Sequence, residues 1–102
     1  MHPGRMWIGW IEFDLLLGDV HSLKGKRSIV RPLVAEVKRR FAVSVAEVGD
    51  QDLHRRCRVG AGVVAGDARH VAEVLDEIER FVAARPETEL LSARRGLASS
   101  ED

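Results

Sequence analysis

The chain has 102 residues, which is enough for one domain and too few for two. Its hydrophobic content of 45% suits a packed core and excludes an intrinsically disordered chain. Sixteen Lys and Arg balance sixteen Asp and Glu, and the single cysteine, Cys57, excludes an intrachain disulfide. The longest apolar run is about half a membrane span and is broken by acidic residues. We therefore predict a soluble cytoplasmic protein with no membrane partner.

The first predicted element is marked by side chains that alternate in its middle. Between residues 6 and 17 one set of alternate positions is apolar: Trp7, Gly9, Ile11, Phe13, Leu15 and Leu17. A period of two with aromatic and branched residues predicts a strand with one buried face. The opposite face carries Trp10, Glu12 and Asp14. Residues 1–5, which precede the pattern, are predicted to be an N-terminal extension.

An amphipathic helix is predicted to follow. Ile29, Leu33, Val37 and Phe41 recur at every fourth position, as on one face of a helix. Ser28 is the predicted N-cap, and Pro32 then falls in the first turn, where its missing N–H costs little.

The rest of the chain is predicted to hold three more strands and a second helix. Short strands are predicted from residue 41 to 48 and from about 56 to 65, separated by a polar turn. A second helix begins after Asp67 and ends near Pro86, because proline disfavours the helical conformation of its predecessor. Residues 88–93 form a last strand. The domain is therefore predicted to span residues 6–95, followed by a polar, frayed tail at 96–102.

The predicted order is strand, helix, strand, strand, helix, strand. Two split βαβ units with right-handed crossovers give an α+β, ferredoxin-like βαββαβ sandwich, with a four-stranded antiparallel sheet and both helices on one face. The first and third strands are the most apolar, so we expect them at the centre of the sheet.

Positive charge is concentrated in one segment of this neutral chain. Residues 21–40 hold seven cationic side chains and one acid, Glu36; the cations are Lys24, Lys26, Arg27, Arg31, Lys38, Arg39 and Arg40. A basic loop that leads into a helix N-terminus attracts phosphates, since free N–H groups and the helix dipole add to the side-chain charge. The candidate RNA- or phosphate-binding residues are Lys24, Lys26, Arg27, Arg31 and Lys38. The alternative is a solvated helix face without a ligand.

The uncovered face of the sheet is the second candidate surface. Trp10 on the first strand and Arg56 and Arg58 on the third are predicted to lie there, with Gly60 and Gly62 beside them. These arginines are expected to pair with acids of the first strand. Small residues permit the close approach of another surface. The face therefore indicates a protein-interaction module that dimerises or binds a partner, with Trp10, Arg56 and Arg58 as its candidate contacts.

No catalytic constellation accompanies these surfaces. The four histidines and one cysteine lack zinc-ligand spacing, and Ser28 has no base tied to it by sequence. The segment Gly25–Ser28 lacks the first glycine and the hydroxyl residue that a phosphate-binding P-loop requires. We expect no metal, no cofactor and no enzymatic activity.

Four sequence blocks resemble the YlxP family of small bacterial proteins of unknown function. They are His21-Ser22-Leu23-Lys24-x-Lys26-Arg27-Ser28, Phe41-x-Val43-Ser44-Val45-Ala46-Glu47-Val48, Asp50-Gln51-Asp52-Leu53 and the strand from Gly60 to Ala65. The resemblance covers residues 6–95. The chain departs from the family at His54, where a Trp is usual, and at Gly25, where an acid is common.

The resemblance implies a ferredoxin-like fold and a loose link with ribosome maturation and translation, because such proteins tend to be encoded among translation and RNA-processing factors. It assigns no catalytic residue. Together with the basic segment, it leads us to expect a non-enzymatic accessory factor that associates with structured RNA or a ribosomal particle. The alternative expectation is the protein-interaction module described above.

Overall fold

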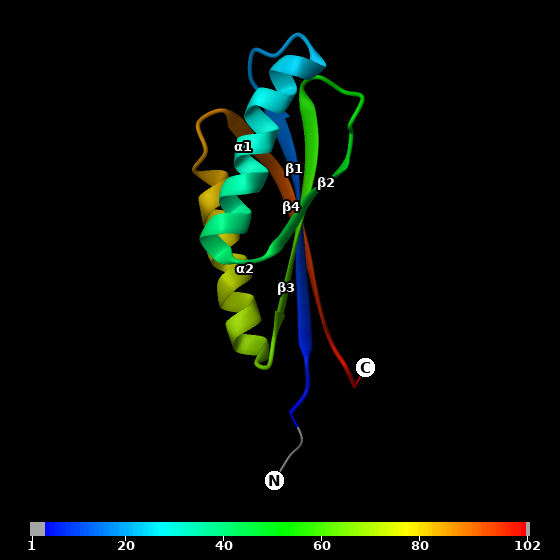
Figure 1. The fold of residues 1–102 in the computed structure, drawn as a ribbon, viewed down its shortest axis with the longest axis vertical. Coiled ribbons are helices and arrows are strands. Elements are labelled where there is room, and N and C mark those ends of the chain that lie inside the picture. The colour runs from blue at the N-terminus through cyan, green and yellow to red at the C-terminus, as the bar shows by residue number, and fades with distance from the viewer. Residues whose placement is uncertain (1–3, 102) are drawn as a thin grey trace.

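Four strands form one antiparallel sheet in the order β2-β3-β1-β4, and both helices cover the same face (Figure 1). The computed structural model describes residues 4–101. The elements are β1 (Trp7–Leu17), α1 (Leu23–Phe41), β2 (Ser44–Gly49), β3 (Arg56–Ala65), α2 (Ala68–Ala83) and β4 (Thr88–Ser99). The ferredoxin-like arrangement is confirmed, with the first and third strands at the centre. The molecule is elongated, with extents of 57 × 21 × 20 Å.

The core lies between the two helices and the sheet. The inward residues of β1, from Ile11 to Leu17, are almost fully buried, as the alternation predicted. From α2 the core receives Val71, Leu75, Ile78 and Val82, which recur at helical spacing. Burying each such side chain contributes about 1.5–3 kcal/mol. No helix within residues 4–101 is both long and apolar enough to cross a membrane.

Helix α1 begins about one and a half turns earlier than the sequence predicted. Its N-cap is Ser22, whose hydroxyl oxygen accepts a hydrogen bond of 3.0 Å from the Gly25 N–H. Ser28 lies inside the helix, where its hydroxyl donates to the carbonyl oxygen of Gly25. The prediction of Ser28 as N-cap was therefore wrong, and Pro32 lies in the helix interior. Residues 23–28, which were predicted as a basic loop, are the first part of the helix.

Strand β4 is twice as long as predicted. It pairs with the whole of β1, from Thr88 opposite Leu17 to Ser99 opposite Trp7. Beyond it, the Ser100 N–H donates to the Met6 carbonyl at 2.8 Å. The segment predicted as a frayed tail from residue 96 is therefore part of the sheet up to Ser99. The predicted extension and tail also include residues 1–3 and 102, which lie outside the described residues.

Candidate functional site

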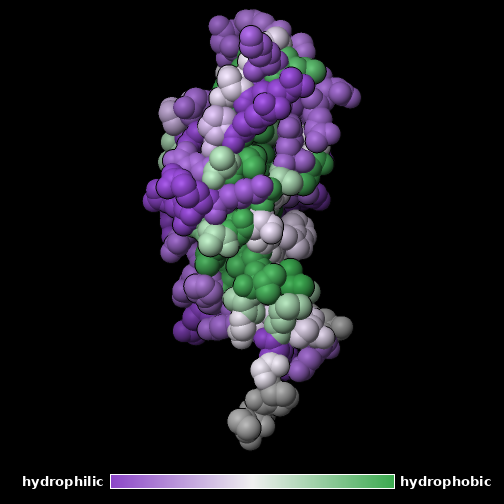
Figure 2. Space-filling model, viewed as in Figure 1, coloured by the Kyte–Doolittle hydropathy of each residue, from purple (hydrophilic) through white to green (hydrophobic). Residues whose placement is uncertain are grey.

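Four exposed cations form a stripe along α1. Lys24, Arg27, Arg31 and Lys38 are exposed and follow one another at spacings of three, four and seven, which places them on one side of the helix. At 1.5 Å per residue the stripe is about 21 Å long. We call these four residues the cationic stripe. In the view of Figure 2, hydrophilic side chains cover the end of the molecule where α1 begins, and hydrophobic ones gather lower down.

The charges of the stripe are not neutralised, in contrast to those of several arginines elsewhere in the chain. Within residues 4–101, no carboxylate lies within 4.0 Å of any of its four cations. By contrast, Arg95 on β4 contacts both Asp76 and Glu79 of α2, and Arg85 contacts Glu36. The unpaired positive charge of the described chain is therefore concentrated on α1.

Lys26 does not belong to this exposed surface, contrary to the sequence-based expectation. Its side chain is 4% exposed and points toward the end of β2. The ammonium donates a 2.6 Å hydrogen bond to the Asp50 carbonyl and lies 3.0 Å from Glu47 Oε2. That oxygen has no well-aligned hydrogen bond, so the contact with Glu47 is an ion pair rather than a directional bond. Lys26 therefore ties α1 to β2.

A groove lies beside the stripe, between α1 and β2. Its apolar floor is formed by Val30, Val34 and Ala35, and Arg31 and Lys38 stand at its rim. Glu47 of β2 lines the opposite side, and the groove has a volume of about 290 Å³. Two cations of the stripe thus border an apolar surface with one carboxylate on its opposite side.

On the uncovered sheet face, the charged side chains form cross-strand ion pairs. Arg56 binds Asp14 through two nitrogens, at 2.6 and 3.3 Å, and this hydrogen bond is the main cause of the raised pKa of Arg56. Glu12 lies 3.1 Å from Arg94 of β4 and 3.6 Å from Arg58. The predicted pairing of these arginines with acids of the first strand is confirmed. Arg56 and Arg58 are therefore already neutralised within the chain.

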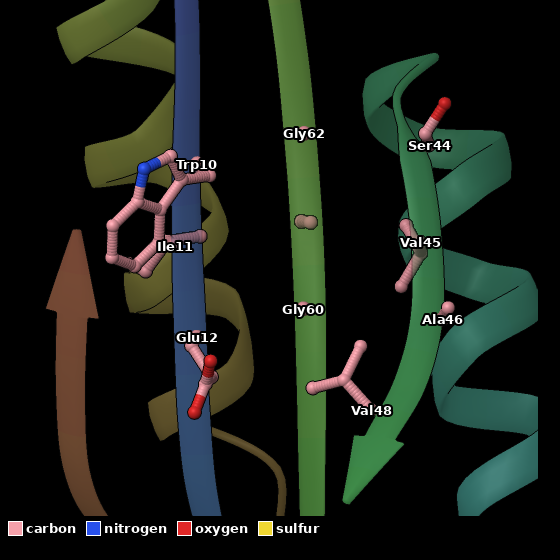
Figure 3. A pocket seen from close by; sticks show the side chains of 10 residues that line it. Trp10, Ile11, Glu12, Ser44, Val45, Ala46, Val48, Gly60 and Gly62 are labelled. Atoms are coloured by element: carbon pink, nitrogen blue, oxygen red, sulfur yellow. The ribbon is translucent and has the colours of Figure 1, made fainter. Parts of the chain in front are cut away.

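The other end of the same face is apolar and contains a shallow trough (Figure 3). Its floor is the bare backbone of Gly60 and Gly62 on β3, and its walls include Trp10 on one side and Val48 on the other. The volume is about 370 Å³. Trp10 lies over Gly96 of β4, where a Cβ atom would overlap the indole, yet its side chain remains 44% exposed. Trp10 thus packs on the C-terminal strand and also borders the trough.

Sequence reasoning missed Glu47, although a signal for it existed. Glu47 lies two positions after the buried Val45 in the same strand, so it faces the helices rather than solvent. Lys26 precedes the buried Val30 by four residues and the buried Leu33 by seven. Because residues at these spacings share one face of a helix, Lys26 lies on the buried side of α1. Within the described part of the chain, no group of three or more His, Cys, Asp or Glu is arranged to hold a metal ion.

Comparisons with known proteins agree with this fold and with the family resemblance. A family model described as a protein of unknown function (DUF503) matches residues 8–95. The chain belongs to this YlxP-like family. It is 30% identical over 82 residues to the uncharacterized protein YlxP of Bacillus subtilis, a match that covers 80% of this chain and 89% of YlxP. A crystal structure of a protein from Shewanella oneidensis superimposes with a TM-score of 0.51 at 17% identity, over 96% of this chain and 93% of that one, which shows the fold alone.

Two of the YlxP-like blocks meet in the structure. The block His21–Ser28 holds both the cap Ser22 and Lys26, and the block Phe41–Val48 holds Glu47. The ion pair of Lys26 with Glu47 therefore joins the two segments that carry the resemblance. We conclude that part of the YlxP-like pattern describes how α1 is anchored to the sheet.

Proposed function

We propose that the protein is a non-enzymatic accessory factor that binds structured RNA through the cationic stripe. The observation that carries the proposal is the contrast in charge pairing. Lys24, Arg27, Arg31 and Lys38 lie exposed and unpaired along one side of α1, whereas carboxylates engage arginines elsewhere in the molecule: Arg56, Arg85, Arg94 and Arg95. Such a row of cations matches the phosphate backbone of a nucleic acid.

The proposed contact reads charge and shape rather than base sequence. Lysine and arginine side chains that touch phosphates position a protein on its nucleic acid without specifying a sequence. The uncovered sheet face is not the RNA surface in this proposal, because β3 carries Arg56, Arg58 and two glycines there and no aromatic side chain for stacking on bases. The resemblance to the YlxP family implies a loose association with translation, so ribosomal subunits and their precursors are the first RNA particles to test.

The test compares two double variants that change the net charge equally. Arg27→Glu/Arg31→Glu reverses the middle of the stripe. Arg69→Glu/Arg80→Glu reverses two exposed arginines of α2 that make no ion pair within residues 4–101. Lys26 is left intact, because its side chain is buried and its loss would disturb the fold. Each protein is co-sedimented with ribosomal subunits and titrated with a structured RNA across a salt series.

We expect wild-type binding to weaken steeply with salt. Four phosphate contacts give a slope of about −3 in a plot of log affinity against log salt concentration. The stripe variant should lose most of the binding, and its slope should become shallower by about two. The α2 variant should bind like the wild type. Equal loss in both variants would indicate an effect of net charge alone, and unchanged binding in the stripe variant would refute the proposal.

A further inference from the structure

The two central strands present complementary rows on the uncovered sheet face. At three of four directly paired positions on β1 and β3, the two side chains differ strongly in size or charge. The pairs are Ile8 with Val64, Trp10 with Gly62, Glu12 with Gly60, and Asp14 with Arg58. At the two middle levels a large or acidic side chain of β1 stands beside a glycine of β3. At the last level, an acid stands beside an arginine.

A two-fold axis makes this face complementary to itself. The axis runs parallel to the strands, midway between the two packed sheets and above the gap between β1 and β3. It then places β1 of one copy over β3 of the other, with directly paired positions at the same height along the strands. Trp10 of each copy then faces the bare backbone at the partner's Gly62. Asp14 likewise faces the partner's Arg58. The interface is isologous, as in most symmetric dimers.

We propose that the uncovered sheet face binds a second copy of this chain in this arrangement. The dimer has both sheets inside and the four helices outside. Sheets that pack face to face lie about 10 Å apart, so that side chains from the two faces interdigitate. Trp10 of the partner fills the trough above Gly60 and Gly62, where in the single chain a Cβ atom at Gly62 would meet no atom within 4 Å.

Charge and hydrophobicity favour a second copy as the occupant. The apolar end of the face exposes Ile8, Trp10, Val48 and Val64 to between 40% and 65% of their full area. A contiguous apolar patch on a small protein marks an interaction site. The charged end brings β1 acids against β3 arginines in the symmetric arrangement, whereas a face of one sign would repel its own copy.

The size of the face sets the strength of the contact. Four strands about 4.8 Å apart and about ten residues long at roughly 3.3 Å per residue give a planar area of about 600 Å². A standard interface buries about 800 Å² on each partner. We therefore expect a reversible dimer whose population depends on protein concentration.

The deciding variant is Gly62→Gln, with Gly66→Gln as its matched control. A side chain at either glycine meets no atom within 4 Å in the single chain, and neither residue has a positive φ. Only Gly62 lies in the trough, since Gly66 is in the turn before α2. Both substitutions are neutral, so they leave the electrostatics of the chain unchanged. The mass in solution is measured by sedimentation velocity and by light scattering from micromolar to millimolar concentration.

We expect the mass in solution of the wild type and of Gly66→Gln to rise with concentration from 11.3 kDa to twice that value. Gly62→Gln should raise the concentration at the midpoint by about tenfold or more, because its side chain occupies the space of the partner's Trp10. Trp10 fluorescence, followed in a Trp7→Phe background, should shift to the blue only in the proteins that dimerise. A monomer at every concentration, or a dimer unaffected by Gly62→Gln, would overturn the proposal and leave the trough to another occupant.

Discussion

Lys26 fixes the start of α1 against β2, and with it the position of the cationic stripe. Its ammonium reaches the Asp50 carbonyl and Glu47 across a buried boundary. Removing one partner of such a pair leaves an uncompensated charge, which costs more than the pair itself contributes. Lys26→Met should therefore lower the free energy of unfolding by about 2–3 kcal/mol, because it strands the Glu47 carboxylate in a largely buried position.

Urea denaturation of a double-mutant cycle checks this prediction. Adding Glu47→Gln to Lys26→Met removes the stranded charge, so the double variant should regain a good part of the lost stability. Additive effects of the two substitutions would show that the side chains do not interact. Arg27→Met is the matched control, since its side chain is exposed and without an ion pair among residues 4–101, and it should change stability by less than about 0.5 kcal/mol.

Cys57 makes the free energy of unfolding depend on pH in the alkaline range. The thiol is fully buried on the inner face of β3, and burial raises its pKa from 9.0 to about 12. Between these values the unfolded chain loses the thiol proton and the folded chain keeps it, so stability falls as pH rises. Between pH 9 and about 12, this thiol changes the free energy of unfolding by about −1.4 kcal/mol per pH unit.

The comparison of wild type with Cys57→Ala measures this contribution. The free energy of unfolding is determined in urea from pH 8 upward, where the difference between the two proteins should narrow as pH rises. Parallel pH profiles would contradict the prediction. In the same experiment a thiol reagent should label Cys57 only in the unfolded wild type, because the neutral, buried thiol is a poor nucleophile.

Single residues also show what the sequence can and cannot reveal. The burial of Cys57 was apparent from its alternation with Val59 and Ala61, because a strand places such residues on one face. The spacing of Lys26 to Val30 and Leu33 indicated its buried side, but its partners could not be predicted, because Glu47 and Asp50 belong to another strand and a turn. Only the packing of α1 on β2 brings them together, and a charged residue in a basic segment otherwise favours exposure.

At the scale of the element, the start of α1 is decided by a single cap. The Ser22 hydroxyl accepts from the Gly25 N–H, and the Lys26 N–H donates the first helical bond to the Ser22 carbonyl. Loss of an N-cap hydroxyl costs about 1 kcal/mol. Ser22→Ala should therefore lower the free energy of unfolding by about that amount. Ser28→Ala should have almost no effect, because alanine has the higher helix propensity at an interior position.

Chemical denaturation of these two variants separates the two possible helix starts. A larger loss for Ser28→Ala than for Ser22→Ala would contradict the observed start at Leu23. The sequence favoured Ser28 as the N-cap, because the segment before it combines glycine with clustered cations, which is typical of a loop. The structure stabilises that segment as helix through the cap and through Lys26.

The length of β4 is a second case in which tertiary contacts outweigh local pattern. Arg94 and Arg95 interrupt the apolar run and therefore favoured a frayed end. In the sheet, Arg94 binds Glu12 of β1 and Arg95 binds two acids of α2. Each arginine thus finds its partner on a neighbouring element, on opposite faces of the strand. Alternation of charged residues with partners on both sides is a strand pattern that composition alone does not reveal.

At the scale of the whole molecule, the two proposed surfaces lie on opposite sides of the sheet. The cationic stripe is on the helix layer and the trough is on the uncovered face (Figures 1 and 3). In the proposed dimer the helices of both copies face outward. Two stripes would then be displayed by one particle, and a long RNA that reaches both would bind through the second stripe as an intramolecular step.

Gly62→Gln separates the RNA binding of a single stripe from the additional binding that the second stripe of the dimer provides. On a short hairpin that engages one stripe, this variant should bind with wild-type affinity, because the stripe is untouched. On a long structured RNA or a ribosomal particle it should bind about tenfold or more weakly, since the monomer lacks the second contact. Filter binding at protein concentrations above the dimerisation midpoint measures both, with Gly66→Gln expected to match wild type on each RNA. Equal affinity of Gly62→Gln and wild type for the long RNA would show that one stripe accounts for all of the binding.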